Sequence, residues 1–209
     1  TNRSENTHTS FEYIGLNIPM GKFGFGFGLI PFSSVGYKLQ SSNVDNQLQY
    51  KYSGNGGLNK AFLGFAYQLS DNLAIGFDAK YNFGNIQNSG LEYLYDDESL
   101  PLDYQAREQN RSDLSGVNFN FGLTFRRGIT ENLELHASLA HSPDYNLSSR
   151  NSRTFASVVI NPNTQIEFPV NEINIDLENL GLDKTDLSMP SVTSFGLGIS
   201  KPKKWFIGA

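Results

Sequence analysis

Cysteine is absent from this chain, tryptophan occurs once and methionine only twice. The lack of cysteine excludes disulfides, thiolate metal ligands and a cysteine nucleophile. No run of about 18 apolar residues occurs, which excludes a transmembrane helix. The net charge of −5 gives no reason to expect a nucleic-acid partner. Spanning β-strands stay open as an interpretation, because each needs only about 9–11 residues of alternating pattern.

Glycine and aromatic residues are abundant: the 209 residues include 20 Gly, 16 Phe and 10 Tyr. Aromatic residues favour strands, and their dispersal along a chain with few good helix formers predicts an all-β protein. No zinc-ligand spacing and no phosphate-binding loop occur. The glycines of FGFGFG alternate with Phe at the period of a strand, so they do not form a dinucleotide-binding turn. We therefore expect no cofactor and no metal.

The stretch from 57 to 84 reads as two strands around a tight turn at Ser70-Asp71-Asn72. Large apolar residues alternate with small or polar ones on both sides of this turn, so that one face of the hairpin is aromatic and the other is not. The same alternation recurs at 11–19, 23–32, 116–125, 133–142 and 191–200. These segments predict an antiparallel sheet of about eight strands.

The predicted connections alternate in length. Short turns fall near residues 20, 71, 131 and 203, whereas 33–59, 85–115 and 143–190 are long, polar stretches with some strand-like fragments. Short turns at one end and long loops at the other are typical of an outer-membrane β-barrel with periplasmic turns and extracellular loops. We interpret residues 1–209 as a single, partial barrel domain, because the first residues contain no signal peptide and the last ones read as an interrupted strand.

The non-apolar face is the predicted lumen side of this barrel, since a membrane barrel turns its apolar face to lipid. The lumen-facing candidates on it are Asp78, Lys80, Asn82, Asn118, Asn120, Glu134 and His136. They could form a polar pathway, or an ion-pair network that braces the wall, which is the interpretation we favour. The glycine cluster of Gly54, Gly56 and Gly57 is a candidate strand kink.

The segment KYSGNGGLNKAFLGFAYQLSDNLAIGFDAKYNFG (51–84) resembles outer-membrane transporters of the FadL type, and 23–39, 113–143 and 189–209 look similar to other parts of that family. The resemblance implies a barrel of 14 strands, of which this chain would be an interior portion without the N-terminal hatch and the C-terminal strands. It also implies passive uptake of hydrophobic small molecules such as long-chain fatty acids. Outer-membrane lipid, lipopolysaccharide and an apolar ligand would then be its partners.

Three other interpretations stay open at this point. The first is a non-transporting outer-membrane barrel with a structural or secretion-accessory role, whose long loops bind a protein partner. The second is a soluble β-sandwich adhesin. The third is catalysis by His136 and Ser138, which share one face, but no acid is placed to orient the imidazole. Polar lining explains these two residues better, so we expect a multi-pass protein of the Gram-negative outer membrane that is not an enzyme.

Overall fold

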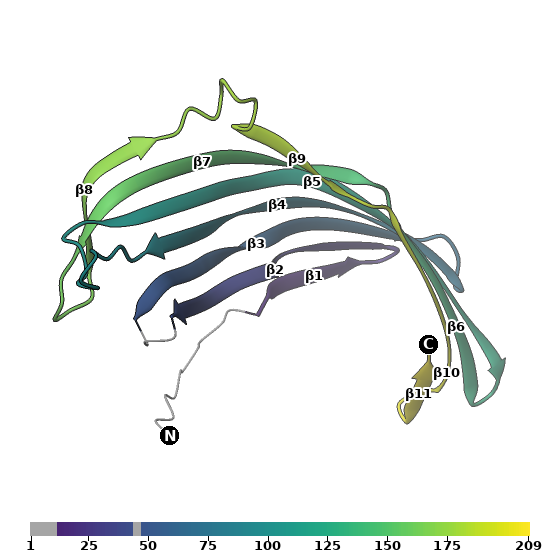
Figure 1. Cartoon of the computed structure of the whole chain (residues 1–209). Coiled ribbons are helices and arrows are strands. Elements are labelled where there is room, and N and C mark those ends of the chain that lie inside the picture. The colour runs from purple at the N-terminus through teal and green to yellow at the C-terminus, as the bar shows by residue number, and fades with distance from the viewer. Residues whose placement is uncertain (1–11, 44–46) are drawn as a thin grey trace.

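The computed structural model describes residues 12–43 and 47–209. Eleven strands are assigned in this part of the chain, and all belong to one antiparallel sheet that arches and curls (Figure 1). The strands are β1 (Ile14–Met20), β2 (Phe23–Ser42), β3 (Leu48–Gln68), β4 (Leu73–Glu92), β5 (Gln105–Thr130), β6 (Leu133–Ser142), β7 (Tyr145–Ile160), β8 (Glu167–Asn174), β9 (Lys184–Met189), β10 (Val192–Lys201) and β11 (Trp205–Gly208). Within the described ranges, no helix has the length and apolar character needed to cross a membrane.

Eight strands follow one another across the sheet in the order β1-β2-β3-β4-β5-β6-β10-β11, which agrees with the expected number of about eight. The remaining strands extend this path. β6 and β7 are successive segments that both pair with β5 and are separated at Pro143. β10 and β9 continue in the same way along β6 and β7, with a break at Pro190. Proline explains both breaks, because it has no N–H for the ladder.

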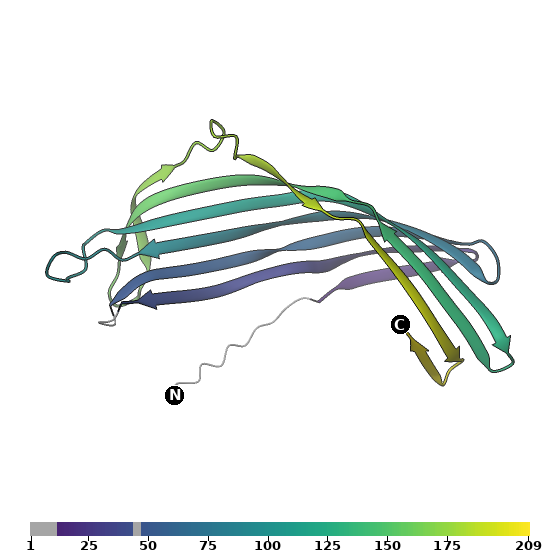
Figure 2. The same cartoon turned by 45° about the vertical axis from the view of Figure 1, so that its right-hand side comes forward.

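The expectation of long loops is wrong. Most of 33–59, 85–115 and 143–190 is strand, because β2, β3 and β4 run for 20, 21 and 20 residues and β5 for 26. The outer halves of these strands form a polar extension of the sheet, built with β7, β8 and β9 (Figure 2). Many of their side chains are polar on both faces, with only isolated apolar residues such as Leu58, Leu91 and Leu114, so the regular hydrophobic alternation that marks a strand in the sequence is missing there.

The point where β5 changes partner depends on a glycine. β5 pairs with β7 up to Ser115 and with β6 from Phe121 onward. Between them, a Cβ on Gly116 would lie 2.7 Å from the carbonyl oxygen of Asn146 and 2.9 Å from Cδ2 of Leu147. The start of β7 therefore packs directly on the backbone of β5, where only glycine leaves room.

Buried apolar side chains form two small clusters rather than one large core. Leu58, Leu114 and Leu147 gather on one face, and Leu91, Ala156 and Val158 lie under the hairpin of β7 and β8 on the other. No second sheet covers either face in the described part of the chain. A β-sandwich buries an apolar face between two sheets, so the adhesin interpretation does not match this architecture.

Candidate functional surfaces

The pairing registers put all seven lumen-facing candidates on one face of the sheet, which we call the small-residue face. Asp78 is opposite Asn120 and Lys80 is opposite Asn118, while His136 and Glu134 are opposite Gly198 and Ser200. Glycine, alanine and serine fill most of the positions between them. That this face lines a lumen stays a prediction.

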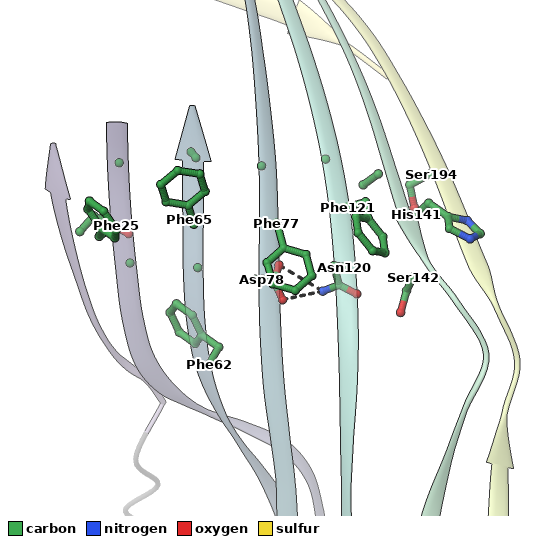
Figure 3. A pocket seen from close by; sticks show the side chains of 18 of the residues that line it. Phe25, Phe62, Phe65, Phe77, Asp78, Asn120, Phe121, His141, Ser142 and Ser194 are labelled. Carbon is green, nitrogen blue, oxygen red and sulfur yellow. Dashed lines mark hydrogen bonds between the residues drawn. The ribbon is translucent and has the colours of Figure 1, made fainter. Parts of the chain in front are cut away.

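A cavity of about 720 Å³ lies on the small-residue face (Figure 3). Its walls come from strands that are far apart in the sheet order, since both Asn17 of β1 and Ser194 of β10 line it. The sheet therefore curls around this face. Glycines at 24, 26, 64, 76 and 122 form much of its floor.

Two polar networks cross neighbouring strands on this face. In the cavity, the Asp78 carboxylate accepts hydrogen bonds from the Asn120 amide at 3.0 and 3.3 Å, which Figure 3 marks, and pairs with the Lys80 ammonium at 3.3 Å. Asn82 Nδ2 donates to Asn118 Oδ1 at 2.9 Å and to the Gly116 carbonyl at 3.2 Å. These contacts join side chains of neighbouring strands, and that they brace the wall of a lumen stays a prediction.

The second network is buried. Asn82 is fully buried and Asn118 is 4% exposed, whereas the ion pair of Asp78 and Lys80 is partly exposed. Buried amides are costly unless they are hydrogen-bonded, so the bond between the two asparagines offsets part of the cost of removing them from water. Asn82 Oδ1 has no hydrogen-bond partner among the described residues.

His136 does not have the surroundings of a catalytic base. Its Nε2 lies 2.8 Å from Ser200 Oγ on β10, and not against Ser138. The nearest acid, Glu134, lies 3.8 Å from the same Nε2 atom and pairs with Arg126, also at 3.8 Å. A catalytic triad needs the acid on the other ring nitrogen, where it fixes the tautomer. That His136 and Glu134 line a lumen stays a prediction.

No group of three or more His, Cys, Asp or Glu residues could hold a metal ion in the ranges that the structure describes. The acidic stretch at 96–98 forms a local turn, in which the Asp96 carboxylate accepts hydrogen bonds from the backbone N–H groups of Glu98 and Leu100. Such turns are an ordinary use of aspartate.

The opposite face, which we call the aromatic face, is apolar over the half of the sheet that contains the short turns. Aromatic side chains on neighbouring strands contact one another across it, as in the pairs Phe25–Phe65 and Phe77–Phe121. Its exposed members include Ile18, Phe25, Phe65, Phe77, Phe119, Phe121, Leu139, Leu197 and Ile207. So large an exposed apolar surface indicates contact with lipid or with other protein.

The same face turns polar in the extension, which the sequence did not reveal. There a groove of about 420 Å³ is lined by hydroxyl and amide side chains, among them Ser53, Gln87 and Gln109. Arg107 pairs with Glu167 at 3.6 Å and with Glu172 at 3.7 Å. This face of the extension is therefore polar enough to contact water or a polar partner.

β3 runs unbroken through Gly54, Gly56 and Gly57. Gly56 has a φ of +126°, and a Cβ on it would overlap the Asn85 carbonyl oxygen, so this position needs glycine. Nothing in these contacts tests whether β3 opens at this point, and the kink stays a prediction.

A single curled antiparallel sheet, with one aromatic face and one small-residue face, defines an all-β protein of barrel-like construction. The family model BamG matches residues 1–209, so the chain belongs to the BamG family. This family is related to the BAM complex, and it is associated with the outer membrane and with the assembly of outer-membrane proteins. No curated protein matches the chain.

Family membership corrects the earlier resemblance. The chain does not belong to the FadL family, and the expectation of lipid or hydrophobic-compound transport is wrong. The strand pattern that it shares with FadL-type proteins is a property of membrane barrels in general, because lipid imposes the same alternation on all of them. BamG is not an enzyme family, and it implies a protein-partner context.

Proposed function

We propose that this chain is a non-enzymatic, multi-pass β-barrel component of the outer membrane that supports the assembly of other outer-membrane proteins. In this role the aromatic face contacts lipid, and the polar extension stands outside the bilayer as the surface for a protein partner. Residues 1–209 then act as one barrel domain. The small-residue face, with its asparagines and its ion pair, lines the interior of the wall.

One observation carries this proposal: the same face changes from aromatic to polar along the same strands. On β5, Phe119 and Phe121 are about half exposed, whereas Gln109 and Arg111 occupy the same face further along the strand. A boundary of this kind is expected where strands leave the hydrocarbon region, because lipid accepts apolar side chains and rejects polar ones. Membership of the BamG family supplies the assembly role.

The test is depletion of the full-length protein in the cells that make it. We expect other outer-membrane barrels to lose their folded form, seen as a smaller heat-resistant fraction on gels, while cytoplasmic proteins keep their levels. Re-expression of the wild-type chain should restore the folded fraction. Normal assembly of outer-membrane proteins after depletion would refute the assembly role, and extraction of the protein by salt without detergent would refute the membrane placement.

A further inference from the structure

The hairpin of β7 and β8 exposes a second apolar surface, which lies in the extension and away from the aromatic face. Phe155 is paired with Ile173, and Val159 with Phe168, so these four side chains share one face of the hairpin. They are 42%, 58%, 37% and 52% exposed, respectively. Exposed apolar side chains gathered within a polar region mark an interaction surface.

The reverse face of the hairpin forms ion pairs with neighbouring strands of the sheet. Glu167 pairs with Lys51 of β3 at 3.3 Å and with Arg107 of β5 at 3.6 Å. Val158 is fully buried in the cluster beneath the hairpin. These contacts hold the tip of the hairpin against the polar groove, which Glu167 helps to line, and the four apolar side chains lie on the opposite face of the same sheet.

The outer edge of β8 is unpaired. Within the described residues β8 pairs only with β7, so one edge has open backbone groups. The N–H of Ile175 donates to the Arg153 carbonyl, and inward N–H groups alternate along an antiparallel strand. The N–H of Ile173 therefore points toward β7, and those of Glu172 and Asn174 point outward. An exposed edge of this kind is a template for another strand.

We propose that the free edge of β8 is a docking site for an extended β-strand of a partner protein, which rests on the proposed role beside other assembly proteins. The strand that fits has apolar side chains on the face shared with Phe168 and Ile173. It has Lys or Arg on the other face, where the Glu172 carboxylate, which pairs with Arg107 at 3.7 Å, is still 47% exposed. Strand addition of this type combines backbone hydrogen bonds with side-chain specificity.

A partner strand explains the observations better than the alternatives do. A lipid surface would cover the apolar side chains but would leave the open N–H and C=O groups of β8 without partners, which is unfavourable away from water. A second copy of β8 would bring two more acids, Glu167 and Glu172, to this edge and no basic residue to pair with them. A strand with alternating apolar and basic residues satisfies the edge, the apolar face and the acid together.

The probe for this site is a fluorescent peptide of about ten residues in which Val and Lys alternate, a length typical of strands. Its binding to the full-length protein, purified in detergent, is measured by anisotropy beside two control peptides. One control is N-methylated at alternate backbone positions, and the other has the same composition with all Val before all Lys. The protein variants are Phe168→Ser/Ile173→Ser and Glu172→Pro, with Leu180→Ser/Leu182→Ser as the matched control in the connection after β8.

We expect saturable binding of the alternating peptide, weakened about tenfold or more by Phe168→Ser/Ile173→Ser and by Glu172→Pro, and unchanged in the control variant. The N-methylated and block peptides should bind at least about tenfold more weakly to the wild-type protein. Equal binding of the block peptide, equal binding to all variants, or no binding of any peptide would each overturn the proposal. If the protein binds phosphatidylcholine vesicles without any peptide, and Phe168→Ser/Ile173→Ser abolishes this binding, the surface contacts lipid and the proposal is overturned. Depletion of the protein reports the assembly role separately, so the two proposals can fail independently.

Discussion

At the scale of single residues, the buried pair of Asn82 and Asn118 makes the most specific polar contact on the small-residue face. Asn118→Ala removes one of the two acceptors of Asn82 Nδ2 and leaves only the Gly116 carbonyl, and we expect it to lower the free energy of unfolding by about 1–3 kcal/mol. Asn120→Ala is the control, because its partner Asp78 is partly exposed and keeps Lys80, so the loss should be about 1 kcal/mol or less. Urea unfolding of the refolded protein measures both. Equal losses in the two variants would contradict the distinction between the buried and exposed networks.

Gly116 and Gly122 are both glycines of β5, yet only one of them is required by packing. A Cβ on Gly122 would have its nearest contact at 3.9 Å, whereas one on Gly116 would overlap the start of β7. Gly116→Ala should therefore lower the stability by about 1–3 kcal/mol through displacement of β7. Gly122→Ala should be neutral or slightly stabilising, because alanine is entropically favoured over glycine in a strand. The midpoint temperature of the heat-dependent gel shift tests this, and a Gly116→Ala protein as stable as wild type would show that β7 does not pack there.

At the scale of elements, an acid of β5 helps to hold β7 in the extension. The hydrogen bond from the Asn110 amide, together with the Arg153 guanidinium, keeps the pKa of Glu108 below its usual value, although partial burial opposes the shift. A lowered pKa in the folded state stabilises the protein above the unfolded-state pKa, and this contribution is lost as the pH falls through the folded-state value. We expect the melting temperature to fall on acidification below about pH 4, and to fall less in Glu108→Gln. The effect is small because the pair is partly exposed.

The control for this pH dependence is Glu98→Gln, which changes an exposed acid in the connection between β4 and β5. It should keep the wild-type difference in melting temperature between neutral and acidic pH. If Glu108→Gln also kept that difference, the contact between β5 and β7 would not depend on the carboxylate.

The sequence predicted those elements in which one face is apolar. The hairpin of β3 and β4 and the strands β6 and β10 were found from their alternation, because a half-buried or lipid-facing strand must alternate. The outer halves of β2 to β5 were read as polar connections with some strand-like fragments, since polar residues such as Asn55, Gln87 and Gln109 occupy positions where large apolar side chains would mark the alternation. The hairpin of β7 and β8 was read only as strand-like fragments in a loop, because its fastening by Lys51 and Arg107 joins strands far apart in sequence.

The candidate site also has a part that the sequence predicted and a part that it did not. The common face of Asp78, Lys80 and Asn120 follows from the period of a strand and from turn positions that the sequence revealed. The contact of His136 with Ser200 depends on the pairing of β6 with β10, across 64 residues of chain, which no local pattern contains. The family could not be recognised from the alternation either, because that pattern depends on whether each face of a sheet is in an apolar or a polar environment, and not on the proteins that the sheet binds.

At the scale of the whole molecule, the position of the lipid boundary can be tested along a single strand. Phe119 and Gln109 occupy the same face of β5, one within the aromatic band and the other in the polar extension. If the band is the lipid-facing surface, Phe119→Arg should cost about 2–4 kcal/mol when it lies near the middle of the bilayer. Gln109→Arg should cost about 1 kcal/mol or less, because water hydrates a charge outside the hydrocarbon region.

The measurement is unfolding of both variants after refolding into lipid vesicles, with the same pair compared in detergent. Asn120→Arg is a third variant, which places the charge one residue from Phe119 but on the small-residue face. Its guanidinium would lie close to the Asp78 carboxylate that Asn120 contacts. We expect the order of destabilisation in vesicles to be Phe119→Arg well above Gln109→Arg and Asn120→Arg. A Phe119→Arg protein that tolerates vesicles as well as Gln109→Arg does would mean that the aromatic face is covered by protein, and the membrane boundary would then have to be sought elsewhere on the sheet.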